Sequence, residues 1–419
     1  MKSFSLKNEA KKQYYRTIFG AIILLFRTFL IIIYKKGYIM NKRWIWEFEE
    51  YPNFTYDSNI LNPLIEEISF LQGSLSTLTS FTSKEKLEEK LTQSLADEVI
   101  NSSAIEGEFL NRESVRKSIA KKLGLDNFAQ TDYATDGIVN ILIDACTNHS
   151  KNLDIERIYK WHASIFPTGR NNLGEKINVG ELRGDYEMII GGGGAKDIVY
   201  YQAPPFDTLF DELIEFFHWF NNTEDSLIKA AIVQLWFLII HPLDDGNGRI
   251  ARTISEYVLS RVEKSYYSKI YSLSKNIYEH KKDYYKILEE TTGFRKKEIP
   301  LDITKWIEYF LSTLISSLKD AEKSLYYIIE KTKFWDTFRD YDINARQTKV
   351  LNKILDIGSE NFEGGLTKKK YIAITKASST TATRDLKELV QWKCIIQKEG
   401  TTGRNTSYSI NLGSVKITV

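Results

Sequence analysis

The chain has 419 residues, of which 42% are hydrophobic and 27% charged, as in folded proteins of two or three domains. The formal net charge of +2 does not by itself indicate that the protein binds nucleic acid or acidic partners. The two cysteines, Cys146 and Cys394, lie far apart without metal-ligand spacing, which argues against a disulfide framework and favours a reducing compartment, here the cytoplasm.

Residues 1–39 differ from the rest of the chain. Within them, residues 18–34 are almost wholly apolar and have basic residues on both flanks. This stretch is slightly short for a membrane span, and Arg27 in its middle costs about 2.5–3.5 kcal/mol on insertion scales. Three interpretations stay open: a marginal membrane anchor, an interfacial helix, or upstream sequence translated ahead of a natural start at Met40.

The next part of the chain predicts helices. Residues 41–57 are rich in aromatic side chains, which we assign to core packing, and leucine and isoleucine recur at three- and four-residue spacing over residues 59–95. We therefore expect an aromatic-rich N-terminal helical domain over residues 40–94. Residues 95–107, LADEVINSSAIEG, predict an amphipathic helix that ends at a glycine cap.

Two further helical patterns and a hairpin follow. Helical periodicity continues over residues 112–150 and 154–165, where we expect His162 to be packed or at the surface rather than catalytic. Two β-rich runs, residues 186–190 and 198–202, flank four glycines and predict a β-hairpin. A phosphate loop is the competing interpretation of these glycines, and we reject it because no Gly-Lys-(Ser/Thr) ending follows them.

The most informative stretch begins where an apolar run ends. Residues 230–240 predict a buried helix, and proline after His241 ends it, because proline disfavours helical backbone in the residue before it. A polar loop with two glycines precedes a new helical pattern over residues 249–261. The glycines let N–H groups turn toward the helix N-terminus, where an anion is favoured, and Arg249 and Arg252 fall on one helix face. The pattern predicts a phosphate site beside a base and a metal ligand.

This stretch, HPLDDGNGRIAR over residues 241–252, resembles the signature of Fic-domain proteins, His-Pro-Phe-x-(Asp/Glu)-Gly-Asn-Gly-Arg-x-x-Arg. Leu243 stands where the family usually has Phe, a change that affects packing under the loop more than chemistry. The resemblance covers nearly everything from Asn41 onward, so we favour Met40 as the natural start. It implies a mainly α fold, in which an all-helical Fic core over residues 95–332 carries a β-hairpin flap.

The resemblance also implies roles within the signature. His241 would be the general base, because its ordinary pKa near 6.5 suits it to accept the proton of a Ser, Thr or Tyr hydroxyl. Asp245 would hold Mg²⁺. Catalysis would also use Asn247 and Arg249, and the nucleotide would be bound by Gly246, Asn247, Gly248, Arg249 and Arg252. Glycine at 248, where the phosphorylating branch of the superfamily has lysine, favours AMP transfer.

Other nucleotide contacts are implied outside the signature. The hairpin resembles the Fic flap, which would add a segment of the target protein as a strand beside the active site. On this interpretation four flap residues lie over the nucleotide: Met188, Ile189, Ile190 and Gly191. Tyr284 and Tyr285 match a tyrosine pair near the adenine, and packing in the core is the alternative for them.

A regulatory motif lies upstream. Residues 102–107, SSAIEG, resemble the inhibitory motif (Ser/Thr)-x-x-x-Glu-(Gly/Asn) of the family, in which the glutamate, here Glu106, pairs with the second signature arginine, here Arg252. That pairing would block the γ-phosphate. The alternative is a solvated glutamate at a helix end.

The function implied is Mg²⁺-dependent transfer of AMP from ATP to a hydroxyl of a target protein, or of the chain itself, with release of pyrophosphate. Inhibition by Glu106 would hold this activity in check. One alternative is a related enzyme that removes AMP or transfers another nucleotide or phosphate-linked group. The other is a DNA-binding regulator whose Fic domain senses nucleotides.

The C-terminal part predicts a separate module. A last long core helix is expected over residues 302–332, and residues 333–419 carry 15 Lys+Arg against 9 Asp+Glu. Three short helices followed by two short strands resemble a winged helix-turn-helix, with residues 379–389 in the recognition position. Three basic residues could contact DNA phosphates: Arg384, Lys387 and Arg404. A protein-docking or dimer-supporting role without DNA is the alternative, and the modest charge excess favours it.

Overall fold

A computed structural model describes residues 43–126, 131, 133–192, 198–263, 269–293 and 301–413, with the side chains at 133, 134, 192, 198 and 404 left aside. The apolar N-terminal extension, most of the glycine run between the hairpin strands and the side chain of Arg404 therefore lie outside the described residues. Among the helices that are described, none combines the length and the apolar character needed to cross a bilayer.

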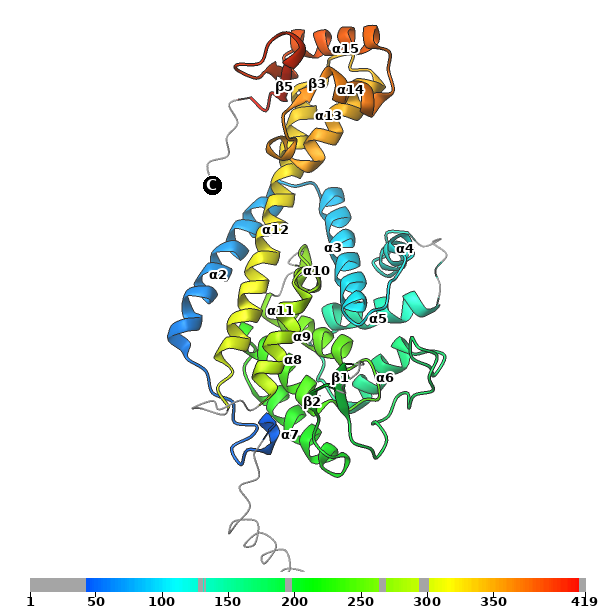
Figure 1. The fold of residues 1–419 in the computed structure, drawn as a ribbon, viewed down its shortest axis with the longest axis vertical. Coiled ribbons are helices and arrows are strands. Elements are labelled where there is room, and N and C mark those ends of the chain that lie inside the picture. Colours follow the sequence, from blue (N-terminus) through cyan, green and yellow to red (C-terminus); the bar gives the residue numbers. More distant parts are fainter. Residues whose placement is uncertain are drawn as a thin grey trace, which may run out of the picture.

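The fold is mainly α-helical, as expected, with small antiparallel sheets (Figure 1). The helices are α2 (Ser58–Ser80), α3 (Lys84–Ile105), α4 (Arg112–Lys122), α5 (Tyr133–Thr147), α6 (Ile155–Ile165), α7 (Leu209–Asn222), α8 (Leu227–Ile240), α9 (Asn247–Glu263), α10 (Leu273–Glu279), α11 (Lys281–Thr292), α12 (Thr304–Thr337), α13 (Ala345–Ile357), α14 (Lys368–Thr375) and α15 (Ser379–Gln391). The strands are β1 (Ile189–Gly192), β2 (Ile198–Gln202), β3 (Leu366–Thr367), β4 (Ile395–Gln397) and β5 (Ser407–Ile410).

Helix α8 is the centre of the larger hydrophobic core. Of its 14 residues, 12 are buried, as expected for a helix that is apolar on nearly every side, and the 12 include the polar Lys229 and Gln234. Helix α9 packs along α8, and the Ser255 hydroxyl joins them by donating a hydrogen bond of 2.8 Å to the carbonyl of Ala230. The loop between α8 and α9 is therefore held at both ends by buried helices.

The larger core is continuous from Trp44 to Ile329. Helix α2 packs along α12, and α3 packs against α10 (Figure 1). The boundary expected at residue 94 falls inside α3, which is one uninterrupted helix, and the side chains before that point belong to the same core. The predicted inhibitory motif therefore lies at the C-terminal end of a helix that packs in the larger core.

The hairpin forms where the two β-rich runs predict it. Strands β1 and β2 pair antiparallel, with Ile190 opposite Tyr201 and an irregularity of register after Ile190. The hydroxyl of Tyr201 donates a hydrogen bond of 2.7 Å to the carbonyl of Ile239, near the end of α8. The base of the hairpin is therefore attached beside the loop that follows α8.

A second, smaller core lies at the far end of α12 (Figure 1). Helix α12 runs past the expected boundary at residue 332, and its last turns contribute Phe334 to this core. Helices α13, α14 and α15 pack on a three-stranded sheet of order β3-β5-β4. Its assignment as a winged helix stays a prediction.

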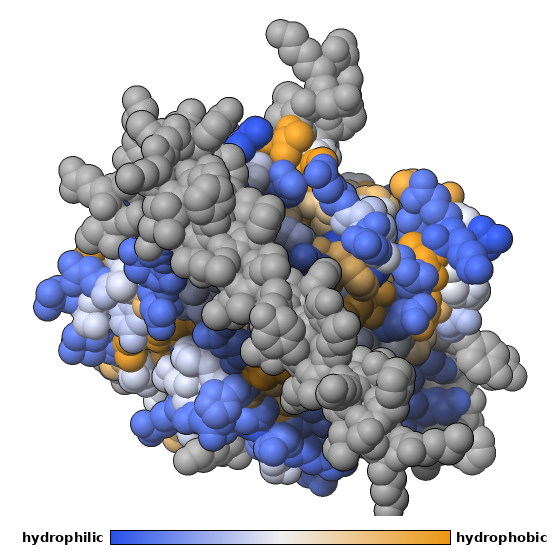
Figure 2. Space-filling model, turned by 90° about the horizontal axis from the view of Figure 1, so that it is seen from below, coloured by the Kyte–Doolittle hydropathy of each residue, from blue (hydrophilic) through white to orange (hydrophobic). Residues whose placement is uncertain are grey.

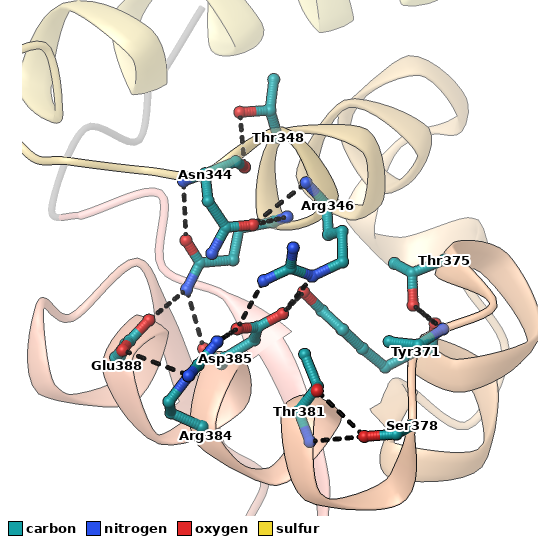
Figure 3. A network of polar contacts seen from close by, with 12 residues as sticks. Asn344, Arg346, Thr348, Tyr371, Thr375, Ser378, Thr381, Arg384, Asp385 and Glu388 are labelled. Atoms are coloured by element: carbon teal, nitrogen blue, oxygen red, sulfur yellow. Dashed lines mark hydrogen bonds and ion pairs between the residues drawn. The ribbon is translucent and has the colours of Figure 1, made fainter.

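One buried carboxylate organises this smaller core. Asp385 on α15 accepts hydrogen bonds from Arg346 Nε at 2.8 Å and from the Tyr371 hydroxyl at 2.8 Å (Figure 3). Although burial opposes its ionisation, these hydrogen bonds hold the pKa of Asp385 below its ordinary value. A single side chain thereby joins α13, α14 and α15.

Where Figure 2 shows described residues at the end of the molecule near α7, the surface is mostly hydrophilic, with hydrophobic residues in separate patches. Phe210 and Ile214 on α7 are among the large exposed apolar side chains. Scattered apolar residues are usual on protein surfaces, so this end indicates no binding site by itself.

Candidate active site

The loop between α8 and α9 is shaped by its own polar groups. The last residue of the α8 turn, His241, has left-handed backbone with φ 49° and ψ 56°, and Gly246 has φ 80°. The side-chain amide of Asn247 closes the loop, because its oxygen accepts from the Leu243 N–H at 3.1 Å and its nitrogen donates to the Leu243 carbonyl at 2.8 Å. Both polar atoms of the Asn247 side chain therefore stabilise the loop, and Asn247 is also the first residue of α9, where backbone N–H groups lack partners within the helix.

The imidazole of His241 is oriented for proton transfer. Its Nδ1 lies 3.1 Å from the carbonyl of Leu238, which can only accept a hydrogen bond, so Nδ1 carries the proton and Nε2 carries the lone pair. Burial, and next to it the positive charge of Arg183, lower the pKa of His241 to about 4. Near neutral pH the ring is therefore neutral, with the lone pair of Nε2 available to accept a proton.

Arg183 is a site residue that the sequence did not single out. It is 1% exposed, and its guanidinium donates to the carbonyls of His241 at 3.1 Å and Tyr186 at 3.0 Å. Its backbone N–H donates to Pro242. It thereby joins the loop to the hairpin and fixes the position of His241. An arginine beside a glycine at the start of a hairpin ordinarily lies in solvent, so only the fold reveals this role.

His162 lies close to the loop but has the opposite tautomer. Its Nδ1 accepts a hydrogen bond from the Gly180 N–H at 3.2 Å, so the neutral ring carries its proton on Nε2. Burial lowers its pKa to about 4. The ring is fully buried against Phe166. It therefore has no lone pair available to a substrate, in agreement with a packing role.

Arg249 and Arg252 lie side by side on the first turns of α9, and each is 2% exposed. The guanidinium of Arg252 donates to Glu106 at 2.8 Å, and to both the hydroxyl and the carbonyl of Ser102. The predicted inhibitory glutamate thus contacts the predicted arginine. Among the described residues, Arg252 Nη1 and Arg249 Nε have no hydrogen-bond partner, so both guanidiniums keep buried donors for a further acceptor.

Gly248 supports the carboxylate of Glu106. A Cβ at position 248 would lie 2.1 Å from Glu106 Oε1. The carboxylate therefore rests against the backbone at the N-terminus of α9, where the helix dipole and unpaired N–H groups favour an anion. In the described structure the carboxylate of Glu106 occupies this position.

Arg249 has its own acidic neighbours. Its Nη1 donates to Glu108 Oε2 at 2.7 Å, and its Nη2 lies 3.4 Å from Asp245 Oδ1. The guanidinium also lies over the ring of Phe166 at 4.8 Å. Neither Glu108 nor Phe166 was among the residues expected from the sequence.

The predicted metal ligand is Asp245, whose side chain is 35% exposed. No group of three or more acidic, histidine or cysteine side chains suited to a metal occurs in the described part of the chain. Mg²⁺ commonly binds through one or two carboxylates together with substrate phosphates and water. A single accessible carboxylate beside two buried arginines fits an ion that arrives with a nucleotide.

The remaining predicted nucleotide contacts divide into buried and exposed groups. Tyr284 is 1% exposed and packs against Trp306, so it belongs to the core, whereas Tyr285 is half exposed and donates to the carbonyl of Ile105 at 2.9 Å. On the flap, Ile189 is exposed. The flap residues that pack against the core are Met188 and Ile190. Tyr285 therefore contacts the end of the predicted inhibitory helix.

Comparison with known proteins identifies two segments. Residues 152–259 match the model of the Fic/DOC family, and residues 44–125 match a domain of unknown function, DUF4172. The first segment contains the loop, both arginines and His162. The chain carries a Fic/DOC family domain. Proteins with this domain are generally transferases that attach nucleotide or phosphate-like groups to proteins.

Solved structures with similarity to the chain are also Fic proteins. A Fic family protein from Desulfovibrio desulfuricans G20 aligns with 18% identity and a TM-score of 0.48, over 86% of this chain and 98% of that one. A Fic domain containing signaling protein from Bacteroides thetaiotaomicron VPI-5482 aligns with 19% identity and a TM-score of 0.47, over 62% and 97%. Fic-1 (residues 134–508) from C. elegans aligns with 19% identity and a TM-score of 0.41, over 66% and 74%.

Proposed function

We propose that this Fic/DOC domain transfers AMP from ATP to a hydroxyl group of a protein, and that the described structure is its inhibited form. The observation that carries the proposal is the α8–α9 loop. It places a neutral imidazole, an accessible carboxylate and two buried guanidiniums around one helix N-terminus. These are the groups that phosphoryl-type transfer needs: a base, charge neutralisation and a fixed anion position.

In the proposed reaction, Nε2 of His241 accepts the proton of the target hydroxyl. The hydroxyl oxygen forms a bond to the α-phosphorus of ATP, the bond to the bridging oxygen breaks, and pyrophosphate leaves with the electron pair. Arg249 and Arg252 would hold the phosphates through charge-assisted hydrogen bonds. Mg²⁺ held by Asp245 would neutralise further phosphate charge.

The flap is the proposed docking place for the target. A two-stranded hairpin leaves backbone N–H and C=O groups unpaired along its outer edges, and an extended segment can pair with such an edge. Because Arg183 and Tyr201 attach the hairpin to the α8–α9 loop, a segment paired with it would lie in a fixed register to His241.

The test is transfer of label from α-³²P-ATP, with Mg²⁺, to the protein itself and to proteins of a cell lysate. The variants are wild type, Glu106→Gly, and Glu106→Gly with His241→Ala. We expect weak labelling by wild type, an increase of about tenfold or more in the first variant, and loss of at least about 100-fold in the second, typical of removing a general base. Absence of label from every variant, when each is folded and binds ATP, contradicts AMP transfer and leaves another donor to be found.

A further inference from the structure

We propose that Glu108 is a second inhibitory residue, which occupies Arg249 as Glu106 occupies Arg252. The inference rests on the proposed function, since it concerns access of a nucleotide triphosphate to the same two arginines. Nothing in the sequence motif that identifies Glu106 extends to position 108.

A helix C-cap presents the two carboxylates together. At the end of α3, the N–H of Gly107 donates to the carbonyl of Ala104 at 3.1 Å, and the N–H of Glu108 donates to the carbonyl of Ser103 at 3.0 Å. These two bonds define a Schellman motif, in which Glu106 is the C-cap, Gly107 is C′ and Glu108 is C″. Gly107 has φ 83°, the left-handed conformation that this motif requires.

The cap directs the side chains of Glu106 and Glu108, on either side of Gly107, toward helix α9. Glu106 reaches Arg252 Nη2 at 2.8 Å, and Glu108 reaches Arg249 Nη1 at 2.7 Å. Because the arginines are three residues apart, they face the cap from adjacent positions on α9. One turn of backbone therefore supplies one carboxylate to each guanidinium.

Burial makes both contacts energetically important. Each guanidinium is 2% exposed and cannot lose its proton, so it needs a buried acceptor in any stable state. Phosphate oxygens could replace the carboxylates, but a phosphate brought beside a retained carboxylate meets like charge at short range. Removal of Glu106 alone would take the carboxylate from Arg252, which keeps its bonds to Ser102, and would leave Arg249 paired with Glu108.

The test compares ATP affinity in full-length variants by calorimetry with Mg²⁺ present. The variants are Glu106→Gly, Glu108→Gln and the double variant, with Glu113→Gln as the matched control, because Glu113 is an exposed glutamate on α4 paired with Lys117. Adenosine, which lacks phosphates, is the second ligand. We expect the double variant to bind ATP about tenfold more tightly than Glu106→Gly, with adenosine affinity unchanged. Glu113→Gln should change neither affinity.

Equal ATP affinity of Glu106→Gly and the double variant overturns the inference, and so does an equal gain for adenosine, which would indicate general opening of the site. Glu108→Ser serves as a second substitution, and melting temperatures verify folding. If the double variant gains ATP affinity while no variant transfers label, the result supports Glu108 as a residue that limits nucleotide binding and contradicts AMP transfer as the function. If Glu106→Gly transfers label while the addition of Glu108→Gln to it leaves ATP affinity unchanged, the proposed function stands and this inference fails.

Discussion

His241 and His162 lie near the same loop and differ in the nitrogen that carries the proton. A carbonyl accepts from Nδ1 of His241, whereas an N–H donates to Nδ1 of His162. One ring therefore offers a lone pair on Nε2, and the other has its lone pair bound. This difference separates a base from a packing residue without reference to either residue's position in a motif.

The two tautomers can be observed directly. In ¹⁵N spectra of the five histidines, we expect His241 and His162 to be neutral at pH 6, with opposite tautomers, because burial lowers both pKa values to about 4. A lowered pKa means that each ring gains its proton only as the pH falls toward 4. His241→Gln and His162→Gln assign the signals. A titration midpoint near the ordinary 6.5 for His241 would contradict the described site.

Sequence reasoning at this scale located the loop residues and missed the residues that position them. The His-Pro break, the glycines and the arginine spacing are local features, so residues 241–252 could be predicted from their order alone. Arg183 and Glu108 act across more than 50 and 140 positions of the chain, respectively. The sequence did not predict that the Asn247 amide closes the loop, because this contact depends on backbone geometry that no spacing specifies; the expected role of Asn247 toward a nucleotide stays a prediction.

At the scale of elements, helix α3 is packed against the core along most of its length, and its C-terminal cap carries the two glutamates that contact α9. Buried Glu98, two turns before the cap, accepts from the Ser272 hydroxyl at 2.8 Å and the Ser274 N–H at 2.9 Å, and these bonds attach α3 to the N-terminus of α10. The cap at Gly107 then directs two carboxylates onto α9. Packing therefore positions helix α3, and the cap at Gly107 positions the carboxylates of Glu106 and Glu108.

Gly107→Ala tests the cap. Nothing lies within 4 Å of a Cβ at 107, so the cost is purely that of left-handed backbone, about 1 kcal/mol. We expect stability in urea to fall by about that amount and ATP affinity to rise, because the strained cap holds its carboxylates less firmly. Gly73→Ala is the matched control, since Gly73 lies within α2 with equally open space, and it should raise stability without changing ATP affinity. Unchanged ATP affinity in Gly107→Ala would show that the cap does not govern access.

Elements were predictable to the extent that their signals are local. The apolar run of α8, the β-rich strands of the hairpin and the C-terminal helix expected over residues 379–389 each formed within a few residues of the expected ranges. The boundary at residue 94 was not recoverable in this way, because leucine spacing cannot show that one helix continues through it. The extension of α12 past residue 332 has the same origin.

At the scale of the whole molecule, two hydrophobic cores share one helix. The larger core ends at Ile329, and Phe334, only five residues further along α12, already belongs to the smaller one. Figure 1 shows the smaller core at one end of α12, distant from the α8–α9 loop. Two separate cores permit one to weaken while the other keeps its structure.

Asp385→Asn tests this independence. The substitution removes the charge that satisfies Arg346 and Tyr371, and we expect it to destabilise the smaller core by about 2 kcal/mol. Hydrogen exchange should quicken in residues 345–410 and stay unchanged in α8 and α9, and ATP affinity should be retained. The control is Asp336→Asn, an exposed pair with Arg339 that should cost less than about 0.5 kcal/mol. Faster exchange throughout α8 would show that the cores unfold together.

Glu106 and Glu108 belong to the same chain as Arg249 and Arg252, so the two carboxylates are tethered near the guanidiniums that they contact. A tethered carboxylate competes with free nucleotide at an effective concentration, on the order of millimolar even for flexible tethers. The effective concentration depends on how tightly residues 83–108 pack against the rest of the protein. It does not depend on the strength of the ion pairs with Arg249 and Arg252. Under the proposed inhibition, activation would require no new bond at the candidate active site. Anything that loosens α3 along its length would lower the effective concentration of the two carboxylates at Arg249 and Arg252.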